Sequence, residues 1–149
     1  MAVHTHDTEA ILERLGRLLR ELTRATGGAD DKEAMTATQR IALVEVGLDG
    51  PLRLSDLAHR MGTSAPTASR AVDALEQLGL VTRAPEPADR RALSIELSPT
   101  GRRLFDERMA RSAAAFAPAA ASLSHDERAA LLELLERMTA ALHDGEAAG

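Results

Sequence analysis

Residues 54–83 read LSDLAHRMGTSAPTASRAVDALEQLGLVTR and carry the signals of two short helices joined by a tight turn. Ser55 is placed to cap a helix over residues 56–61, and Gly62 follows at the position where a positive φ angle commonly ends a helix. Ser64 is placed to cap the second helix, which runs towards Gly79. The stretch therefore predicts a helix, a turn and a second helix.

The second helix has one apolar side and one polar side. Pro66 suits its first turn, where a missing N–H does no harm. The apolar side carries Ala68, Ala71, Val72, Leu75 and Leu78. Away from the core we place Ala65, Thr67, Ser69, Arg70, Asp73, Glu76 and Gln77. The exposed start of this helix therefore carries small, hydroxyl-bearing and basic side chains.

Two strands follow, over residues 80–83 and 93–97, joined by a loop over residues 84–92. In the second strand apolar residues alternate with polar ones, and the apolar set is Leu93, Ile95 and Leu97. Alternation of this kind is typical of a strand with one buried face. A helix, a tight turn, a second helix and a β-hairpin are the parts of a winged helix-turn-helix.

Two helices are predicted before this module. The first begins at Asp7 or Thr8, repeats leucine at three- and four-residue spacing, and stops at Gly27. The second opens with a Thr-x-x-Gln capping box at residues 36–39 and closes before Gly50.

Two more helices are predicted after the hairpin. Ser98 caps a long helix that runs towards Phe116 and that Pro118 should kink or end. A second capping box, at residues 124–127, opens the last helix. The expected fold class is mainly α with a small β-hairpin wing.

The apolar stripes of the terminal helices need a surface to pack against. The winged module already has its own interior, and about 20 or more apolar side chains are not left in water. A partner protomer is therefore expected to cover them. The predicted domains are residues 1–35, an N-terminal dimerisation helix and linker; 36–99, a DNA-binding domain; and 100–149, C-terminal dimerisation helices.

Charge is distributed unevenly along the chain. The formal net charge of the 149 residues is −5. Residues 1–52 carry −3, residues 53–103 carry +2 and residues 104–149 carry −4. Only the middle third is positive, so a basic patch is compatible with the acidic average.

Composition excludes several classes of function. The absence of cysteine excludes disulfides, thiolate metal sites and cysteine nucleophiles. Two Phe without Tyr or Trp leave little for single-stranded nucleic acid to stack on. The N-terminus lacks a signal-peptide pattern, and the longest apolar run, residues 113–121, is too short to span a membrane. We expect a cytoplasmic protein with no membrane partner.

Catalytic and metal patterns are weak. Ser124, His125 and Asp126 are neighbours at a helix start and are interpreted as a cap, because triads assemble from distant positions. His4 and His6 resemble a chelate, but no helix carries histidines at i and i+4. No Gly-rich phosphate loop is present. We expect no catalytic residue, no metal, no cofactor and no enzymatic activity.

The chemistry of the module suits duplex DNA. A helix N-terminus offers N–H groups and a positive dipole end to phosphate. Arg70 could reach a guanine edge or a phosphate. Arg90 or Arg91, on the hairpin loop, could enter the minor groove, whose negative potential attracts a guanidinium.

The ordered motifs of residues 36–104 resemble the MarR family of bacterial transcriptional regulators. They are Thr36-x-x-Gln39, Leu54-Ser-Asp-Leu-Ala58, Ser64-Ala-Pro-Thr-Ala-Ser-Arg70, Leu75-Glu-x-Leu-Gly-Leu-Val81, Asp89-Arg-Arg91 and Leu97-Ser-Pro-Thr-Gly101. The resemblance implies a homodimer that binds a pseudo-palindromic operator on double-stranded DNA. It also implies release by a small organic effector, at a site that the sequence does not identify.

The resemblance also implies site residues. Thr67, Ser69 and Arg70 match recognition-helix contacts, and Arg83 matches a strand position near the DNA backbone. Arg91 matches the wing arginine, which Asp89 would orient. Ala65 departs from the family pattern, where a longer polar side chain is frequent. The predicted DNA-binding set is Ser64, Ala65, Thr67, Ser69, Arg70, Arg83, Asp89, Arg90 and Arg91.

Two other classes of function are alternatives. A winged fold can dock a protein instead of DNA, but the hydroxyl-and-arginine face of residues 64–79 argues against that reading. A small hydrolase or metal enzyme is the other alternative, for which turnover of an ester or stoichiometric metal would be the sign.

Overall fold

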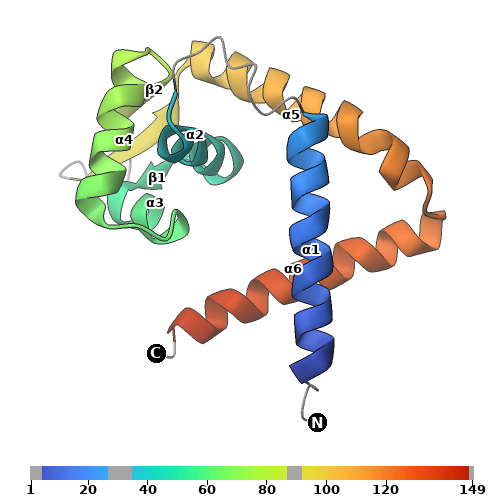
Figure 1. Ribbon diagram of the computed structural model, residues 1–149. Helices are drawn as coiled ribbons and strands as arrows, with labels where there is room; N and C mark the ends of the chain where they lie inside the picture. Colours follow the sequence, from blue (N-terminus) through green and yellow to red (C-terminus); the bar gives the residue numbers. More distant parts are fainter. Residues whose placement is uncertain (1–4, 27–34, 87–91, 148–149) are drawn as a thin grey trace. The chain divides into compact units, whose positions relative to one another are not determined.

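A computed structural model describes residues 5–26, 35–86 and 92–147 of the chain (Figure 1). The elements in chain order are α1 (Thr5–Ala25), α2 (Ala37–Asp49), β1 (Leu52–Arg53), α3 (Leu54–Arg60), α4 (Ala65–Gln77), β2 (Val81–Pro85), β3 (Leu93–Leu97), α5 (Pro99–Ala121) and α6 (His125–Ala147). The expectation of a mainly helical winged fold is confirmed.

The chain divides into two compact units. One comprises residues 27–111, and the other comprises residues 1–26 with residues 112–149. Helix α5 belongs to both, because its first turns bury Gly101, Leu104 and Phe105 in the unit of residues 27–111. Because residues 36–99 are predicted to contact DNA, we call residues 27–111 the DNA-reading unit.

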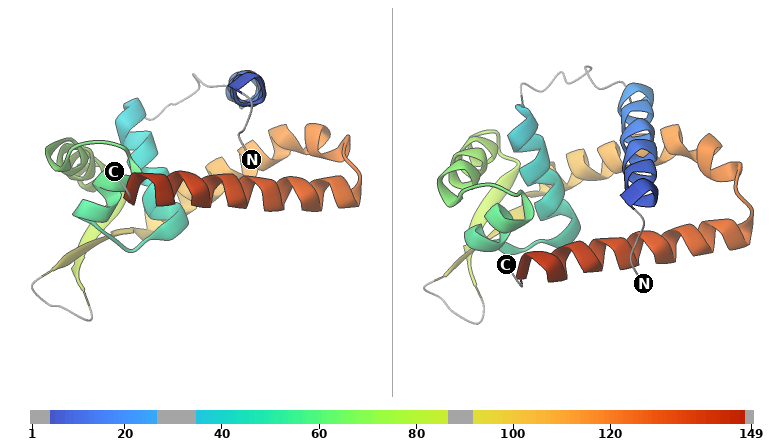
Figure 2. Two further views of the ribbon diagram at one scale, coloured as in Figure 1. Left: turned by 90° about the horizontal axis from the view of Figure 1, so that it is seen from below. Right: turned by 60° about the horizontal axis from the view of Figure 1, so that its bottom comes forward.

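The sheet of the DNA-reading unit has three antiparallel strands in the order β1-β3-β2. The prediction of two strands was incomplete, because β1 pairs Leu52 with Ile95 and Arg53 with Ser94. A strand of two residues is too short to produce a periodic pattern, and its pairing partner lies far along the chain. Strands β2 and β3 project from the helices of the unit as a hairpin (Figure 2).

Strands β2 and β3 differ from the prediction, β2 in its length and β3 in which of its residues are buried. Strand β2 runs two residues further than expected, to Pro85. In β3, Leu93 is exposed and Ser94 is buried, which reverses the predicted alternation at the wing end of the strand. Ser94 Oγ donates a hydrogen bond to the Ala84 carbonyl oxygen at 3.3 Å, so the buried hydroxyl is satisfied.

Helices α2, α3, α4 and the sheet enclose one hydrophobic core. Its buried members are Met35, Ala42, Leu43, Val46, Leu52, Leu57, Ala71, Val72, Leu75, Leu80, Val81, Ile95 and Leu104. The predicted apolar stripe of α4 supplies part of this core, except that Leu78 is half exposed at the helix end. The DNA-reading unit is therefore held together by its own interior.

The start of α5 is fixed tightly to the end of α4. Ser98 Oγ accepts a hydrogen bond from the Gly101 N–H at 2.9 Å and donates one to the Gly79 carbonyl oxygen at 2.6 Å, which confirms the predicted cap. A Cβ on Gly101 would lie 1.9 Å from the Leu80 carbonyl oxygen. Glycine is therefore required here by close backbone approach.

Two predicted helix starts were wrong. Helix α1 begins at Thr5 rather than after a cap at Asp7 or Thr8. Helix α3 begins at Leu54, and its N-cap position is Arg53 rather than Ser55, because β1 runs directly into the helix. Of the two alternatives predicted for Pro118, the end of the helix is wrong, because α5 continues through Pro118 to Ala121. The two predicted capping boxes, at Thr36 and Ser124, are confirmed.

The helices outside the DNA-reading unit carry large apolar side chains that the chain itself leaves exposed. On α1 these are Ile11, Leu12, Leu18 and Leu19. On α6 they are Leu131, Leu132, Leu134, Leu135, Met138 and Leu142. Faces of this kind mark contact surfaces.

Candidate nucleic-acid interface

A tight turn joins α3 to α4. Gly62 has a φ of +60°, as the sequence predicted, and a Cβ there would meet nothing within 4 Å. The requirement for glycine at this position is therefore conformational rather than steric. The Thr63 N–H donates to the Ala58 carbonyl oxygen at 3.0 Å, which closes the last turn of α3.

Helix α4 begins with the predicted serine cap. Ser64 Oγ accepts from the Thr67 N–H at 3.4 Å and lies 3.0 Å from Thr67 Oγ1. Pro66 has no N–H to offer. Two of the first backbone donors of α4 are therefore unavailable to a ligand, because Pro66 has none and the Thr67 N–H is already bonded to Ser64.

The predicted recognition residues share the first turns of α4. Ser64, Ala65 and Arg70 are exposed, and Thr67 and Ser69 are half-buried. Arg70 Nε donates to the Pro66 carbonyl oxygen at 3.3 Å, which holds the side chain against its own helix. No carboxylate in the described parts of the chain pairs with the Arg70 guanidinium. This cation is available for an outside anion.

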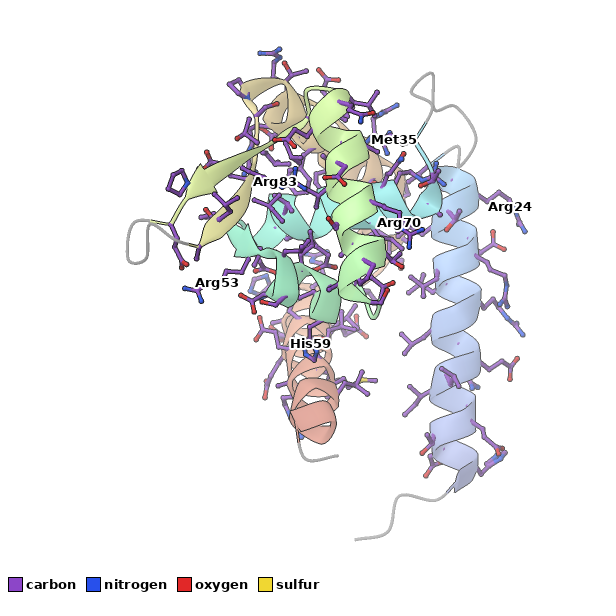
Figure 3. The ribbon with its side chains drawn as sticks, turned by 90° about the vertical axis from the view of Figure 1, so that its left-hand side faces the viewer. Arg24, Met35, Arg53, His59, Arg70 and Arg83 are labelled. Atoms are coloured by element: carbon purple, nitrogen blue, oxygen red, sulfur yellow. The ribbon has the colours of Figure 1, made fainter. Side chains whose placement is uncertain are left out.

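Arg83, unlike Arg70, forms ion pairs within the protein. It lies on β2, between the strands and α4, while Arg70 lies on the other side of α4 in the view of Figure 3. Its Nη2 lies 2.6 Å from Asp73 Oδ1, and its Nη1 pairs with Glu76 Oε2. The structure thus joins Arg83 to two carboxylates of α4. The sequence predicted only that these carboxylates lie on the polar side of the helix.

The base of the wing carries a second ion pair that the sequence analysis missed. Arg53 Nε donates to Glu86 Oε2 at 2.7 Å, from β1 across the central strand. The Glu86 N–H donates to the Ala92 carbonyl oxygen at 2.9 Å, which extends the hairpin beyond β2. No local pattern could reveal this pair, because it depends on β1, which was not predicted.

The predicted wing residues Asp89, Arg90 and Arg91 lie outside the described residues. The described hairpin ends at Glu86 and Ala92, on either side of them.

Other functional signs are few in the part of the chain that the structure describes. No group of three His, Asp or Glu side chains there is placed to hold a metal ion. No described helix is both long and apolar enough to cross a membrane.

The geometry defines a class of protein: a winged helix-turn-helix with a hydroxyl- and arginine-bearing second helix, which is the architecture of DNA-binding regulators. Comparison with known proteins agrees. The sequence profile of the MarR family matches residues 35–93. The transcriptional repressor NicR of Pseudomonas putida is 27% identical over 132 residues, which cover 86% of this chain and 84% of NicR.

Two solved structures extend the likeness along the chain. Rv1404 from Mycobacterium tuberculosis is 27% identical with a TM-score of 0.71, over 94% of this chain and 95% of that one. BpsR of Bordetella bronchiseptica is 23% identical with a TM-score of 0.63, over 93% of this chain and 98% of that one. The chain belongs to the MarR family of winged helix-turn-helix transcriptional regulators, a family of DNA-binding proteins rather than enzymes.

Proposed function

We propose that this protein is a homodimeric repressor that binds a pseudo-palindromic operator in the cytoplasm and is released by a small organic effector. The observation that carries the proposal is the free first half of α4, where Arg70 is exposed beside the hydroxyls of Ser64, Thr67 and Ser69. Short side chains at the start of a helix allow its backbone to approach base edges in the major groove.

Two copies of α4 would enter successive major grooves about 10 base pairs apart. Asp89, Arg90 and Arg91, at the tip of the wing, would serve the flanking minor grooves. Residues 1–35 and 100–149 would supply the dimer contact, and the exposed apolar faces of α1 and α6 support that assignment. Residues 36–99 would contact the operator, with Ala65 facing a thymine methyl group.

The effector proposal rests on relatives. NicR is described as a repressor, and the BpsR structure is described as showing regulation of DNA binding by 6-hydroxynicotinic acid. A small organic acid is therefore the first effector to test. It would release DNA only to the extent that it binds the DNA-free arrangement more tightly.

The test is fluorescence anisotropy with a labelled duplex from the region upstream of the gene, repeated over several salt concentrations. The logarithm of the affinity should fall linearly with the logarithm of the salt concentration, by about 0.9 for each neutralised phosphate. Arg70→Ala and Arg91→Ala should each weaken binding. Arg17→Ala, which removes a charge that pairs with Glu13 on α1, should not.

Two results would contradict the proposal. One is a wild-type protein that shows no preference for its upstream duplex over unrelated DNA. The other is an Arg70→Ala variant with unchanged affinity, which would show that the exposed first half of α4 does not contact DNA.

A further inference from the structure

The ion pairs of Arg83 connect two elements of the winged helix-turn-helix, helix α4 and strand β2. Asp73 and Glu76 stand three residues apart on α4, so their carboxylates lie on one face of the helix. Arg83 stands opposite Ile95 in the β2–β3 ladder. One guanidinium therefore bridges the recognition helix and the outer strand of the wing.

The side chain of Arg83 is the most enclosed of the three. It is 25% exposed, against 52% for Asp73 and 43% for Glu76. A guanidinium offers donors in a planar fork, which allows one residue to serve two separate carboxylates at once. Both of its terminal nitrogens then donate to carboxylates, whose negative charges oppose a further contact with phosphate.

The charge of α4 makes this engagement important. The helix carries a single arginine, Arg70, and two carboxylates. Without Arg83 its ionic side chains would sum to a negative charge at the surface proposed to face DNA. Phosphates would be repelled by that charge. With Arg83 in place the two carboxylates have a cationic partner.

We infer that Arg83 is a positioning residue: it fixes α4 to β2 and neutralises Asp73 and Glu76, and it does not contact DNA phosphate. The inference rests on the proposed DNA-binding function and replaces the role that the sequence motif implied for Arg83. Arg53 and Glu86 hold the far side of the same hairpin in a comparable way.

A set of four variants separates positioning from contact. The single variant is Arg83→Met, which keeps the length of the side chain without its charge. The double variant is Asp73→Asn with Glu76→Gln, and the triple variant combines all three changes. Arg17→Met is the control, because it removes one arginine and one exposed ion pair from α1. Operator affinity is measured by anisotropy over a salt series.

If Arg83 is a positioning residue, Arg83→Met weakens binding by about tenfold or more, because two carboxylates are left without a partner. The triple variant then recovers to within a few-fold of wild type, with an unchanged salt dependence. If Arg83 contacts phosphate, the triple variant stays as weak as Arg83→Met and its salt slope falls by about one. That result overturns the inference, and so does an Arg83→Met variant that binds like wild type.

Hydrogen exchange gives a readout that needs no DNA. The amides of β2 should exchange faster in Arg83→Met and in the double variant than in wild type or Arg17→Met. Unchanged exchange overturns the inference that Arg83 fixes β2 to α4. A wild-type protein that binds no duplex refutes the proposed function, and the exchange experiment still decides whether Arg83 holds β2 to α4.

Discussion

The DNA-reading unit and the terminal helices bury their apolar residues in different ways. Leu43, Leu57 and Leu75 of the DNA-reading unit are completely buried within the chain. Leu12 of α1 is 70% exposed and Leu142 of α6 is 73% exposed. The first region is complete as a single chain, whereas the second is complete only when another surface covers it. Stability should therefore be intrinsic in one region and dependent on association in the other.

The largest expected effect is in the core of the DNA-reading unit. Leu75→Ala should lower the free energy of unfolding by about 2–5 kcal/mol, because it leaves a cavity in a closed interior. Leu78→Ala, in the same chain segment but half exposed, should change it by no more than about 0.5 kcal/mol. Urea denaturation followed by circular dichroism measures both. Equal losses of unfolding free energy in the two variants would contradict the assignment of Leu75 to a closed core and of Leu78 to its edge.

The next effect tests the other side of the comparison. Leu135→Ala on α6 should lower the free energy of unfolding by about 1.5–3 kcal/mol if a partner protomer buries the side chain. The unfolding midpoint of the wild-type protein should then rise with protein concentration. Glu136→Ala, one residue further along the helix, is the matched control. A monomer in sedimentation, together with an unfolding midpoint that does not depend on protein concentration, would show that no partner protomer covers Leu135.

A smaller effect concerns the start of the recognition helix. Ser64→Ala removes the Oγ acceptor of the Thr67 N–H and should cost about 1 kcal/mol of stability. Ser69→Ala removes a hydroxyl of the same helix that does not occupy a cap position, so its cost should be smaller. Thermal denaturation of the two variants compares them directly. A cost for Ser69→Ala as large as that for Ser64→Ala would remove the special role of the cap.

Most of the fold could be predicted because its signals are local. The serine caps, the glycine with positive φ at Gly62 and the stripe of α4 each depend on residues within a few positions of one another. Strand β1 could not be predicted, because Leu52 and Arg53 become a strand only through pairing with β3. The same holds for Ser94, whose burial depends on the neighbouring strand rather than on its own polarity.

The residue types of the candidate site could be predicted from the sequence, but its ion pairs could not. The sequence correctly placed Ser64, Thr67 and Arg70 together at the start of α4. It gave no indication that Arg83 faces Asp73 and Glu76, because those residues are brought together by the packing of β2 against α4. Motif matching assigns residue types to positions, whereas the ion pairs within the protein decide which cations are available to a ligand.

The smallest effect is a pH-dependent one at the start of α6. The Ser124 N–H donates to Glu127 Oε2 at 2.7 Å, and this backbone hydrogen bond lowers the pKa of the Glu127 carboxyl below its usual 4.5. A carboxylate whose pKa is lower in the folded than in the unfolded state stabilises the fold above the unfolded pKa. That contribution is lost as the pH falls through the folded pKa.

Helix α6 of the wild-type protein should therefore lose helicity on acidification below pH 4.5 more steeply than that of Glu127→Gln, which keeps an acceptor that does not titrate. Circular dichroism over a pH series measures this difference. Glu133→Gln, in the middle of the same helix, controls for the loss of one negative charge. Because the cap lies within one chain, the difference should be the same at every protein concentration, unlike the effect of Leu135→Ala. A pH response of Glu127→Gln that matches wild type would show that the carboxylate does not cap the helix.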